Sequence, residues 1–253
     1  MSLDRILIAN RSEIAMRVTR TVADRGGKSI LPYTAEDLTA PATALADEAY
    51  ALPAGSGYTD AQAILELAKS TGAQAIHPGY GFLAENVEFA RAVIEAGITW
   101  IGPAPEAMEA LGDKMSARQV AESAGVDPVP GITDAVTEAS VVKEFAARYG
   151  YPVALKRTDG GGGRGITVLY NDDEVDTTPA LDEFQAATPG TAGGTVTQIL
   201  EKFVTHARHV ETQCARDTFG NFAVVSTRDC TLQRRNQKLL EEAPAPFLPA
   251  DIE

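Results

Sequence analysis

Hydrophobic positions in the first half of the chain follow two alternating patterns. Short apolar runs predict buried strands, and longer stretches with apolar residues three or four positions apart predict amphipathic helices. The runs are RILIA (5–9), SILPY (29–33), AQAIHPGYG (73–81) and ITWIGP (98–103), and the helical stretches are residues 12–26, 60–72 and 84–97. Strands that alternate with helices of this length predict right-handed crossovers and a doubly wound parallel sheet, which is an α/β fold.

The pattern changes at about Val126, where a segment rich in proline and glycine predicts a linker. Neighbouring strands then predict a small α+β domain rather than a parallel sheet. The expected elements are a helix at 137–149, strands at 151–157 and 165–170, a helix at 173–187 and a strand at 195–204. Two runs with period-2 alternation, residues 208–216 and 221–229, predict further β structure.

Ligands of a doubly wound sheet bind at the carboxyl ends of its strands. This rule places Asn10, the loop His77–Phe82, Gly102 and Pro103 on one rim. A dinucleotide-binding Rossmann domain is the alternative for this half of the chain. Its glycine fingerprint is missing, because the first strand is followed by NRSEIA and not by G-x-G-x-x-G.

Composition narrows the choice of partners. The chain has 35 acidic and 22 basic residues, a net charge of −13, which argues against a nucleic-acid or anionic-membrane surface because both partners need cations. The first residues lack the apolar core of a signal peptide, and no apolar run is long enough to span a bilayer, so we predict a cytoplasmic protein. Cys214 and Cys230 are too few for a disulfide framework, and both are predicted to be buried.

The local charge is reversed between His206 and Lys238. The basic residues there are Arg208, Arg216, Arg228, Arg234, Arg235 and Lys238, and the acidic residues are Glu211, Asp217 and Asp229. A cationic segment within an acidic protein favours an anionic small molecule as ligand. A solvated basic turn is the alternative.

The run GGGGRG at residues 160–165 stands between two strand-like runs. It is not a Walker A loop, since Ile166 follows where Lys and Ser or Thr would open a helix. We interpret it as a hairpin lid whose bare N–H groups can approach phosphate oxygens. Lys156 precedes the lid and is expected on the face opposite to Val153 and Leu155. A solvated hairpin with an extended lysine is the alternative.

Seven motifs occur together: ILIANRSEIAMRV, AIHPGYGFLAEN, WIGP, GDKMSAR, GGGGRG, LEKFVTHARHVETQ and RDCTLQRRNQKLLEEAPAP. In this combination and order the chain resembles the biotin carboxylase component of biotin-dependent carboxylases, which has the ATP-grasp fold. The resemblance covers essentially the whole chain but only about the first half of such a domain. It implies a Rossmann-like N-terminal biotin carboxylase domain (1–112), linker helices with an ATP-grasp lid (113–203), and the start of a β-rich C-terminal ATP-grasp domain (204–253).

The resemblance also implies a nucleotide site. Phosphate binding is implied for Lys114, Lys156 and the lid backbone at Gly162 and Gly163, adenine binding for the hinge Glu201, Lys202, Phe203 and Val204, and a place near ribose or phosphate for His209, Gln233 and Asn236. A solvated helix start for Lys114 and a structural role for His209 are the alternatives.

Lys238 matches the position that holds bicarbonate and is the predicted catalytic residue. Phosphorylating bicarbonate requires cations that neutralise the oxygens of both reactants. The implied reaction is the ATP- and bicarbonate-dependent carboxylation of biotin on a carrier domain, the first half-reaction of an acyl-CoA carboxylase, to which the motif EEAPAPF is similar. The implied cofactors are ATP, Mg²⁺ and biotin. The implied partners are a biotin carboxyl carrier domain, a carboxyltransferase subunit and further copies of the chain.

Other functions stay open: a pyruvate or urea carboxylase, another ATP-grasp ligase, or a non-catalytic nucleotide-binding or assembly module. The chain departs from the family pattern at Asn236, where many relatives have histidine, at Asp159, where many have glycine, and at Ser12, a glycine position where we expect a helix cap. Residues 249–253 are typical of a first helical turn without its helix. We therefore expect an N-terminal portion of a longer polypeptide, inactive alone, with its Mg²⁺ ligands after Glu253.

Overall fold

The computed structural model describes residues 3–112, 114–157, 165–181, 198–234 and 237–249. The chain divides into two compact units, residues 1–127 and 128–253. Each unit has its own sheet and its own hydrophobic core, and they are described in turn.

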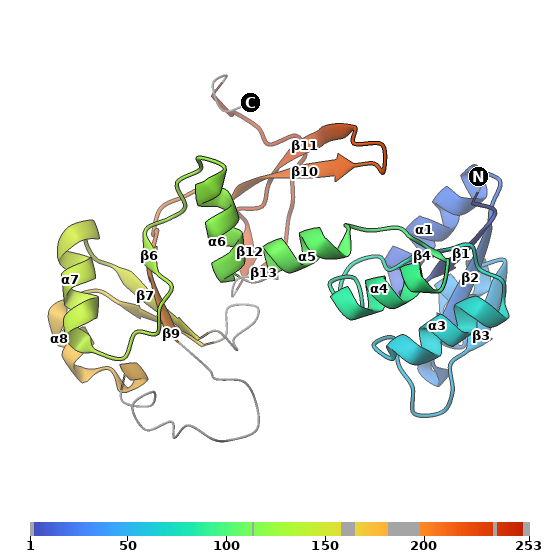
Figure 1. The fold of residues 1–253 in the computed structure, drawn as a ribbon, viewed down its shortest axis with the longest axis horizontal. Coiled ribbons are helices and arrows are strands. Elements are labelled where there is room, and N and C mark those ends of the chain that lie inside the picture. The colour runs from blue at the N-terminus through green and yellow to red at the C-terminus, as the bar shows by residue number, and fades with distance from the viewer. Residues whose placement is uncertain (1–2, 113, 158–164, 182–197, 235–236, 250–253) are drawn as a thin grey trace. The chain divides into compact units, whose positions relative to one another are not determined.

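Five parallel strands form the sheet of the first unit, in the order β3-β2-β1-β4-β5 (Figure 1). Their bounds are β1 (Arg5–Ile8), β2 (Lys28–Tyr33), β3 (Glu48–Ala51), β4 (Ala75–His77) and β5 (Thr99–Trp100). The helical elements are α1 (Ser12–Asp24), the 3₁₀ turn η1 (Ala35–Asp37), α2 (Pro41–Leu45), α3 (Ala61–Ser70), α4 (Val87–Glu95), α5 (Pro105–Gly112) and α6 (Lys114–Ser123). The predicted parallel sheet is confirmed.

Successive residues of the central strand β1 bury opposite faces of this sheet. Leu7 is fully buried in a cluster with side chains of α3 and α4, whereas Ile8 is fully buried in a cluster with side chains of α1 and α2. Burying each such side chain stabilises the fold by roughly 1.5–3 kcal/mol. Both faces are therefore covered, as a doubly wound sheet requires.

The start of α1 differs from the expectation. Ser12 has φ +52° and is the first residue of the helix, while the N-cap position is Arg11. The prediction that Ser12 caps the helix is wrong. A positive φ places Cβ close to the following carbonyl oxygen, which costs an L-residue about 1–2 kcal/mol and favours glycine.

We expect Ser12→Gly to raise the free energy of unfolding by about 0.5–1 kcal/mol, because glycine adopts this φ without strain but loses more entropy on folding. The midpoint of urea denaturation measures the change. Ser140 provides the matched control. It lies in the first turn of the helix Ala139–Tyr149, and its φ is not positive. Ser140→Gly should lower stability, and equal losses in the two variants would contradict the account.

The second unit begins with a four-stranded antiparallel sheet in the order β6-β9-β7-β8. The strands are β6 (Gly131–Ile132), β7 (Val153–Arg157), β8 (Ile166–Leu169) and β9 (Gln198–Lys202), and the helices are α7 (Ala139–Tyr149) and α8 (Asp172–Thr177). The two helices lie along one side of β7 and β9 (Figure 1). Val153, Leu155 and Leu200 are buried in the cluster that joins the sheet to these helices.

The helix predicted at residues 173–187 is interrupted in the structure. α8 ends at Thr177, and Thr178 is extended with ψ 125°. Thr178 precedes Pro179, and the ring of a proline disfavours the helical conformation of the residue before it. The remainder of the predicted helix, residues 182–187, lies outside the described residues.

Two hairpins complete the second unit. β10 (Val210–Arg216) pairs with β11 (Phe222–Asp229), and β12 (Gln233–Arg234) pairs with β13 (Gln237–Lys238). Cys230 is buried, as predicted, but Cys214 is exposed, so the prediction for Cys214 is wrong. The alternating pattern of β10 predicts that one face of the strand is buried. Cys214 and the residues on either side of it, Gln213 and Ala215, are nevertheless all exposed within the described part of the chain.

Candidate functional site

The loop after β4 is tied to the end of β1 by a buried asparagine. The side-chain Nδ2 of Asn10 donates to the carbonyl oxygens of Pro78 (2.8 Å) and Tyr80 (2.9 Å), and Asn10 is fully buried. The N–H of Ala9 donates to the carbonyl of His77. The structure therefore brings Asn10 and the His77–Phe82 loop together at the carboxyl ends of the strands, as the topology predicts.

Gly79 allows this close approach. Its φ is +66°, and a Cβ built there would lie 2.6 Å from Asn10 Nδ2 and 2.6 Å from a methyl carbon of Ile14. Gly79→Ala should lower the free energy of unfolding by about 2–4 kcal/mol, because it combines backbone strain with overpacking. Gly72 has the same φ but no atom within 4 Å of its Cβ position. Gly72→Ala should therefore cost only about 1 kcal/mol, and equal costs by urea denaturation would show that the contact with Asn10 is unimportant.

A buried carboxylate lies at the same ends of the strands. Asp37 accepts hydrogen bonds from Arg11 Nε (2.6 Å), Arg11 Nη2 (2.5 Å) and the Tyr58 hydroxyl (2.7 Å). The Arg11 guanidinium lowers the pKa of Asp37, while burial and the hydrogen bond to Asp37 raise the pKa of Tyr58 to about 12. Sequence reasoning missed this group, because its members come from three separate segments.

In the four-stranded sheet of the second unit, Lys156 pairs with Glu201. The two side chains come from neighbouring strands β7 and β9, on the face opposite to the helices, since Leu155 and Leu200 are buried under those helices. The expected orientation of Lys156 is confirmed. A phosphate would meet an ammonium group already compensated by the Glu201 carboxylate.

The predicted hinge uses most of its groups inside the protein. The backbone N–H of Lys202 donates to Pro130 and that of Phe203 to Pro152, while the Lys202 side chain donates to the carbonyls of Gly150 and Tyr151. Within the described residues the N–H of Val204 has no hydrogen-bond partner, and Val204 is 53% exposed. This amide can therefore still bind the edge of a planar ligand.

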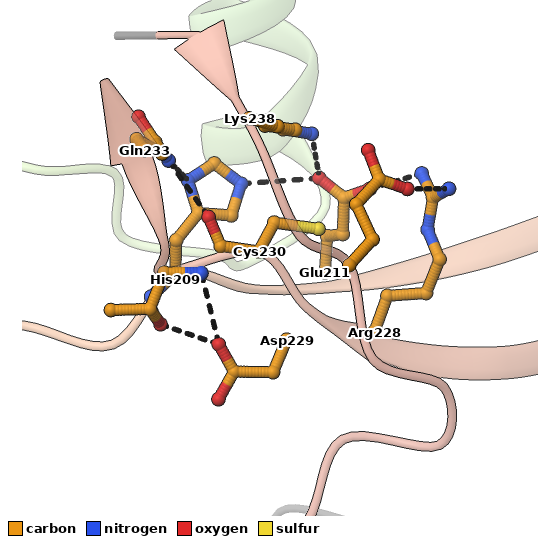
Figure 2. Close-up of polar contacts among 9 residues, drawn as sticks. His209, Glu211, Arg228, Asp229, Cys230, Gln233 and Lys238 are labelled. Carbon is orange, nitrogen blue, oxygen red and sulfur yellow. Dashed lines mark hydrogen bonds and ion pairs between the residues drawn. The ribbon is translucent and has the colours of Figure 1, made fainter. Parts of the chain in front are cut away.

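Glu211 is the centre of a cluster of charged side chains in the second unit (Figure 2). Its Oε2 accepts from Lys238 Nζ (2.5 Å) and contacts His209 Nε2 (3.1 Å), and its Oε1 forms an ion pair with Arg228. His209 and Glu211 point the same way because they are two residues apart along one extended segment. The pKa of Glu211 is lowered to about 2. The hydrogen bond from Lys238 has the largest effect, followed by the hydrogen bond from His209 and the positive charge of Arg228. Glu211 in turn raises the pKa of Lys238, so both groups are ionised at neutral pH.

A chain of hydrogen bonds fixes the imidazole of His209. Gln233 Nε2 donates to the carbonyl of Cys230 (3.0 Å) and contacts His209 Nδ1 (3.4 Å), as Figure 2 shows. An amide nitrogen can only donate, so Nδ1 accepts. Nε2 then carries the proton and donates to Glu211.

The structure thus brings together three of the predicted site residues, His209, Gln233 and Lys238, in one cluster, and two more, Lys156 and Glu201, in another. α6 begins at Lys114, but nothing is described of its side chain. Gly162, Gly163, Asn236 and Asp159 lie outside the described residues.

Sequence reasoning missed Glu211 as a site residue. The available signal was its spacing of two from His209 in the motif HVE, which places both side chains on one face of an extended segment. Its contact with Lys238, 27 residues away, depends on the turn between β11 and β12.

Two features are absent from the part of the chain that the structure describes. Within these ranges no group of three or more His, Cys, Asp or Glu side chains could hold a metal ion. Likewise, none of the described helices is both long and apolar enough to cross a membrane.

Two family profiles match the chain in succession. The N-terminal domain of biotin carboxylase matches residues 2–108, and the ATP-binding domain of the carbamoyl-phosphate synthase L chain matches residues 113–252. The acyl-coenzyme A carboxylase alpha3 subunit of Mycobacterium leprae, a biotin-dependent enzyme, is 47% identical over 247 residues, which are 96% of this chain and 41% of that protein.

Solved structures of biotin carboxylases are also similar to this chain. The biotin carboxylase of Campylobacter jejuni in complex with β,γ-ATP superposes with a TM-score of 0.85 at 39% identity, over 99% of this chain and 56% of that chain. The biotin carboxylase domain of the Hydrogenobacter thermophilus 2-oxoglutarate carboxylase, in complex with ADP, Mg²⁺ and bicarbonate, gives a TM-score of 0.84 at 41% identity, over 98% and 55%.

This chain spans 41% of the Mycobacterium leprae protein and just over half of the two solved chains. The biotin carboxylase N-terminal domain is followed directly by the ATP-binding domain, in the order that the sequence motifs indicate. The chain therefore belongs to the biotin carboxylase family.

Proposed function

We propose that the polypeptide containing this chain uses ATP and bicarbonate to carboxylate biotin on a carrier domain, as the first half-reaction of an acyl-CoA carboxylase. The observation that supports this most strongly is the cluster at Lys238. Its ammonium group is fixed by Glu211 at 2.5 Å, next to His209 and Gln233, in a chain similar to a structure that contains ADP and bicarbonate.

The chemistry requires positive charge at this position. A bicarbonate oxygen attacks the γ-phosphorus of ATP, ADP leaves, and a mixed carboxylic–phosphoric anhydride forms. The N1′ of biotin then attacks the carbonyl carbon, phosphate leaves, and the N1′ proton is lost. Lys238 would hold the bicarbonate oxygens and offset the repulsion between two anionic reactants. Lys156 would contact the phosphates, in competition with Glu201 for the same ammonium group.

Further parts of the proposal rest on the resemblance alone. Lys114, Asn236 and the lid backbone at Gly162 and Gly163 would complete the phosphate site, and residues 201–204 would bind adenine. The domains would be residues 1–112, 113–203 and 204–253. The protein would be located in the cytoplasm. Its partners would be a carrier domain, a carboxyltransferase subunit and further copies of the chain. Within the described residues, no group of three or more His, Cys, Asp or Glu side chains fits the Mg²⁺ ion that the resemblance implies.

The acceptor of the carboxyl group has two candidates. An acyl-CoA thioester is favoured by the relative from Mycobacterium leprae, which is the alpha subunit of an acyl-coenzyme A carboxylase. A 2-oxo acid is favoured by the structural similarity to the domain from the 2-oxoglutarate carboxylase.

The full-length protein should hydrolyse ATP only when bicarbonate is present, and free biotin should stimulate the rate. Bicarbonate dependence without a response to biotin would indicate another ATP-grasp ligase. Nucleotide binding without any bicarbonate-dependent hydrolysis would indicate a non-catalytic module.

A further inference from the structure

Arg228 joins two carboxylates in the cluster around Glu211. Its Nη2 pairs with Glu211 Oε1, and its Nη1 pairs with Glu241 Oε2 at 2.8 Å. Arg228 lies on β11 directly opposite Glu211 on β10, so the two side chains share one face of the hairpin (Figure 2). Each terminal nitrogen of the guanidinium therefore holds a different acid.

The backbone near Glu241 is itself held against β11. Asp229 and Glu242 exchange two backbone hydrogen bonds of 2.9 and 3.0 Å, and the N–H of Ala245 donates to Thr227 Oγ1 at 3.1 Å. Glu241 is thereby presented to Arg228 by a fixed segment. The Nε of Arg228 is buried and makes no hydrogen bond among the described residues, so the two ion pairs are what orient the guanidinium.

We propose that Arg228 is a positioning residue for the bicarbonate site, and that Glu241 fixes Arg228. The guanidinium holds Oε1 of Glu211, which turns Oε2 toward Lys238 and His209. Glu241 keeps the guanidinium from turning away and balances its charge, so that Lys238, Arg228, Glu211 and Glu241 together carry no net charge. The role in bicarbonate binding rests on the proposed function, whereas the effect on Lys238 does not.

The kinetic test uses bicarbonate-dependent ATP hydrolysis by the full-length protein. Arg228→Gln should lower kcat/KM for bicarbonate by about 10- to 100-fold, since small displacements of a positioned group cost this much, while the KM for ATP should change less than about threefold. Arg228→Lys should recover part of the loss, because one ammonium can still pair with Glu211.

A double variant separates positioning from charge. Arg228→Gln with Glu241→Gln restores the net charge of the cluster but not the contact to Glu211, so it should stay as impaired as Arg228→Gln alone. Recovery in the double variant would overturn the proposal, because charge balance would then explain the effect. Arg216→Gln, at the exposed far end of the same hairpin, loses the same charge and should leave both constants unchanged.

A second readout does not depend on catalysis. Labelling of Lys238 by an amine-reactive reagent, followed by peptide mass spectrometry, should be about threefold faster or more in Arg228→Gln than in the unaltered protein or in Arg216→Gln, because an unaligned Glu211 shields the amine less. If Lys238 labelling and kcat/KM are both unchanged, Arg228 has no positioning role. If the unaltered protein shows no bicarbonate-dependent hydrolysis, the proposed function fails, and the labelling result still decides whether Arg228 positions Lys238.

Discussion

Lys238→Gln is expected to reduce bicarbonate-dependent ATP hydrolysis by the full-length protein about 10³-fold or more. The ammonium group lies 2.5 Å from Glu211 and is the only charge that the substitution removes. Without it, two anionic reactants meet beside the Glu211 carboxylate, and the developing negative charge has no lysine to neutralise it. Initial rates against bicarbonate concentration, at saturating ATP, measure the loss.

Two further variants test the position of this charge. Lys143 forms an ion pair with Asp176 at the protein surface, so Lys143→Gln removes the same charge away from the cluster and should leave the rate unchanged. Lys238→Arg keeps the charge but not the compact geometry of an ammonium group, and it should retain only part of the activity. Normal kinetics in Lys238→Gln would show that bicarbonate binds elsewhere.

The second large effect is expected for Glu211→Gln, which should lower kcat/KM for bicarbonate by about 10²-fold. The carboxylate is the common partner of Lys238, His209 and Arg228. A neutral amide cannot hold three such donors in place, although it has almost the same size. Glu211→Asp keeps the charge on a shorter side chain and should lose less activity than Glu211→Gln. Equal activity in the unaltered protein and in Glu211→Gln would contradict the role of this carboxylate.

Glu211 should also make the free energy of unfolding depend on pH in the acidic range. The pKa of Glu211 is about 2 in the folded protein, below its ordinary value of 4.5, so its ionised form is stabilised by folding. That contribution is complete above the unfolded pKa and is lost as the pH falls from about 4.5 through about 2. The difference in unfolding free energy between the unaltered protein and Glu211→Gln should therefore be constant near neutral pH and shrink over this acidic range. A constant difference down to about pH 2 would contradict the low pKa.

Most of the first unit could be predicted from the hydrophobic pattern. Leu7 and Ile8 bury opposite faces, so their strand must lie between two helical layers, and the apolar run around them shows this. β3 was not predicted, because EAYA is short and has no apolar run. β6 was not predicted either. It has only two residues, Gly131 and Ile132, in a segment rich in proline, and it is a strand because it pairs with β9, which is distant in the sequence.

The candidate site was predictable only in part. The motifs identified Lys156, His209, Gln233 and Lys238 by resemblance, and their assigned roles stay predictions. Glu211 was missed because its contacts with Arg228 and Lys238 depend on strand register and on a turn, neither of which has a local pattern. At Cys214 the local pattern was misleading instead. The alternation of apolar and polar residues predicted a buried side chain, but Cys214 is exposed.

If the polypeptide containing this chain transfers bicarbonate carbon to biotin at the expense of ATP, the transferred carbon can be followed directly. The most direct test is to incubate the full-length protein with radiolabelled bicarbonate, ATP and free biotin, and to measure acid-labile label that becomes stable on methylation. We predict label in carboxybiotin that requires ATP and disappears in Lys238→Gln. Vigorous bicarbonate-dependent ATP hydrolysis with no label in biotin, even when a biotinylated carrier domain is supplied, would contradict the proposed function.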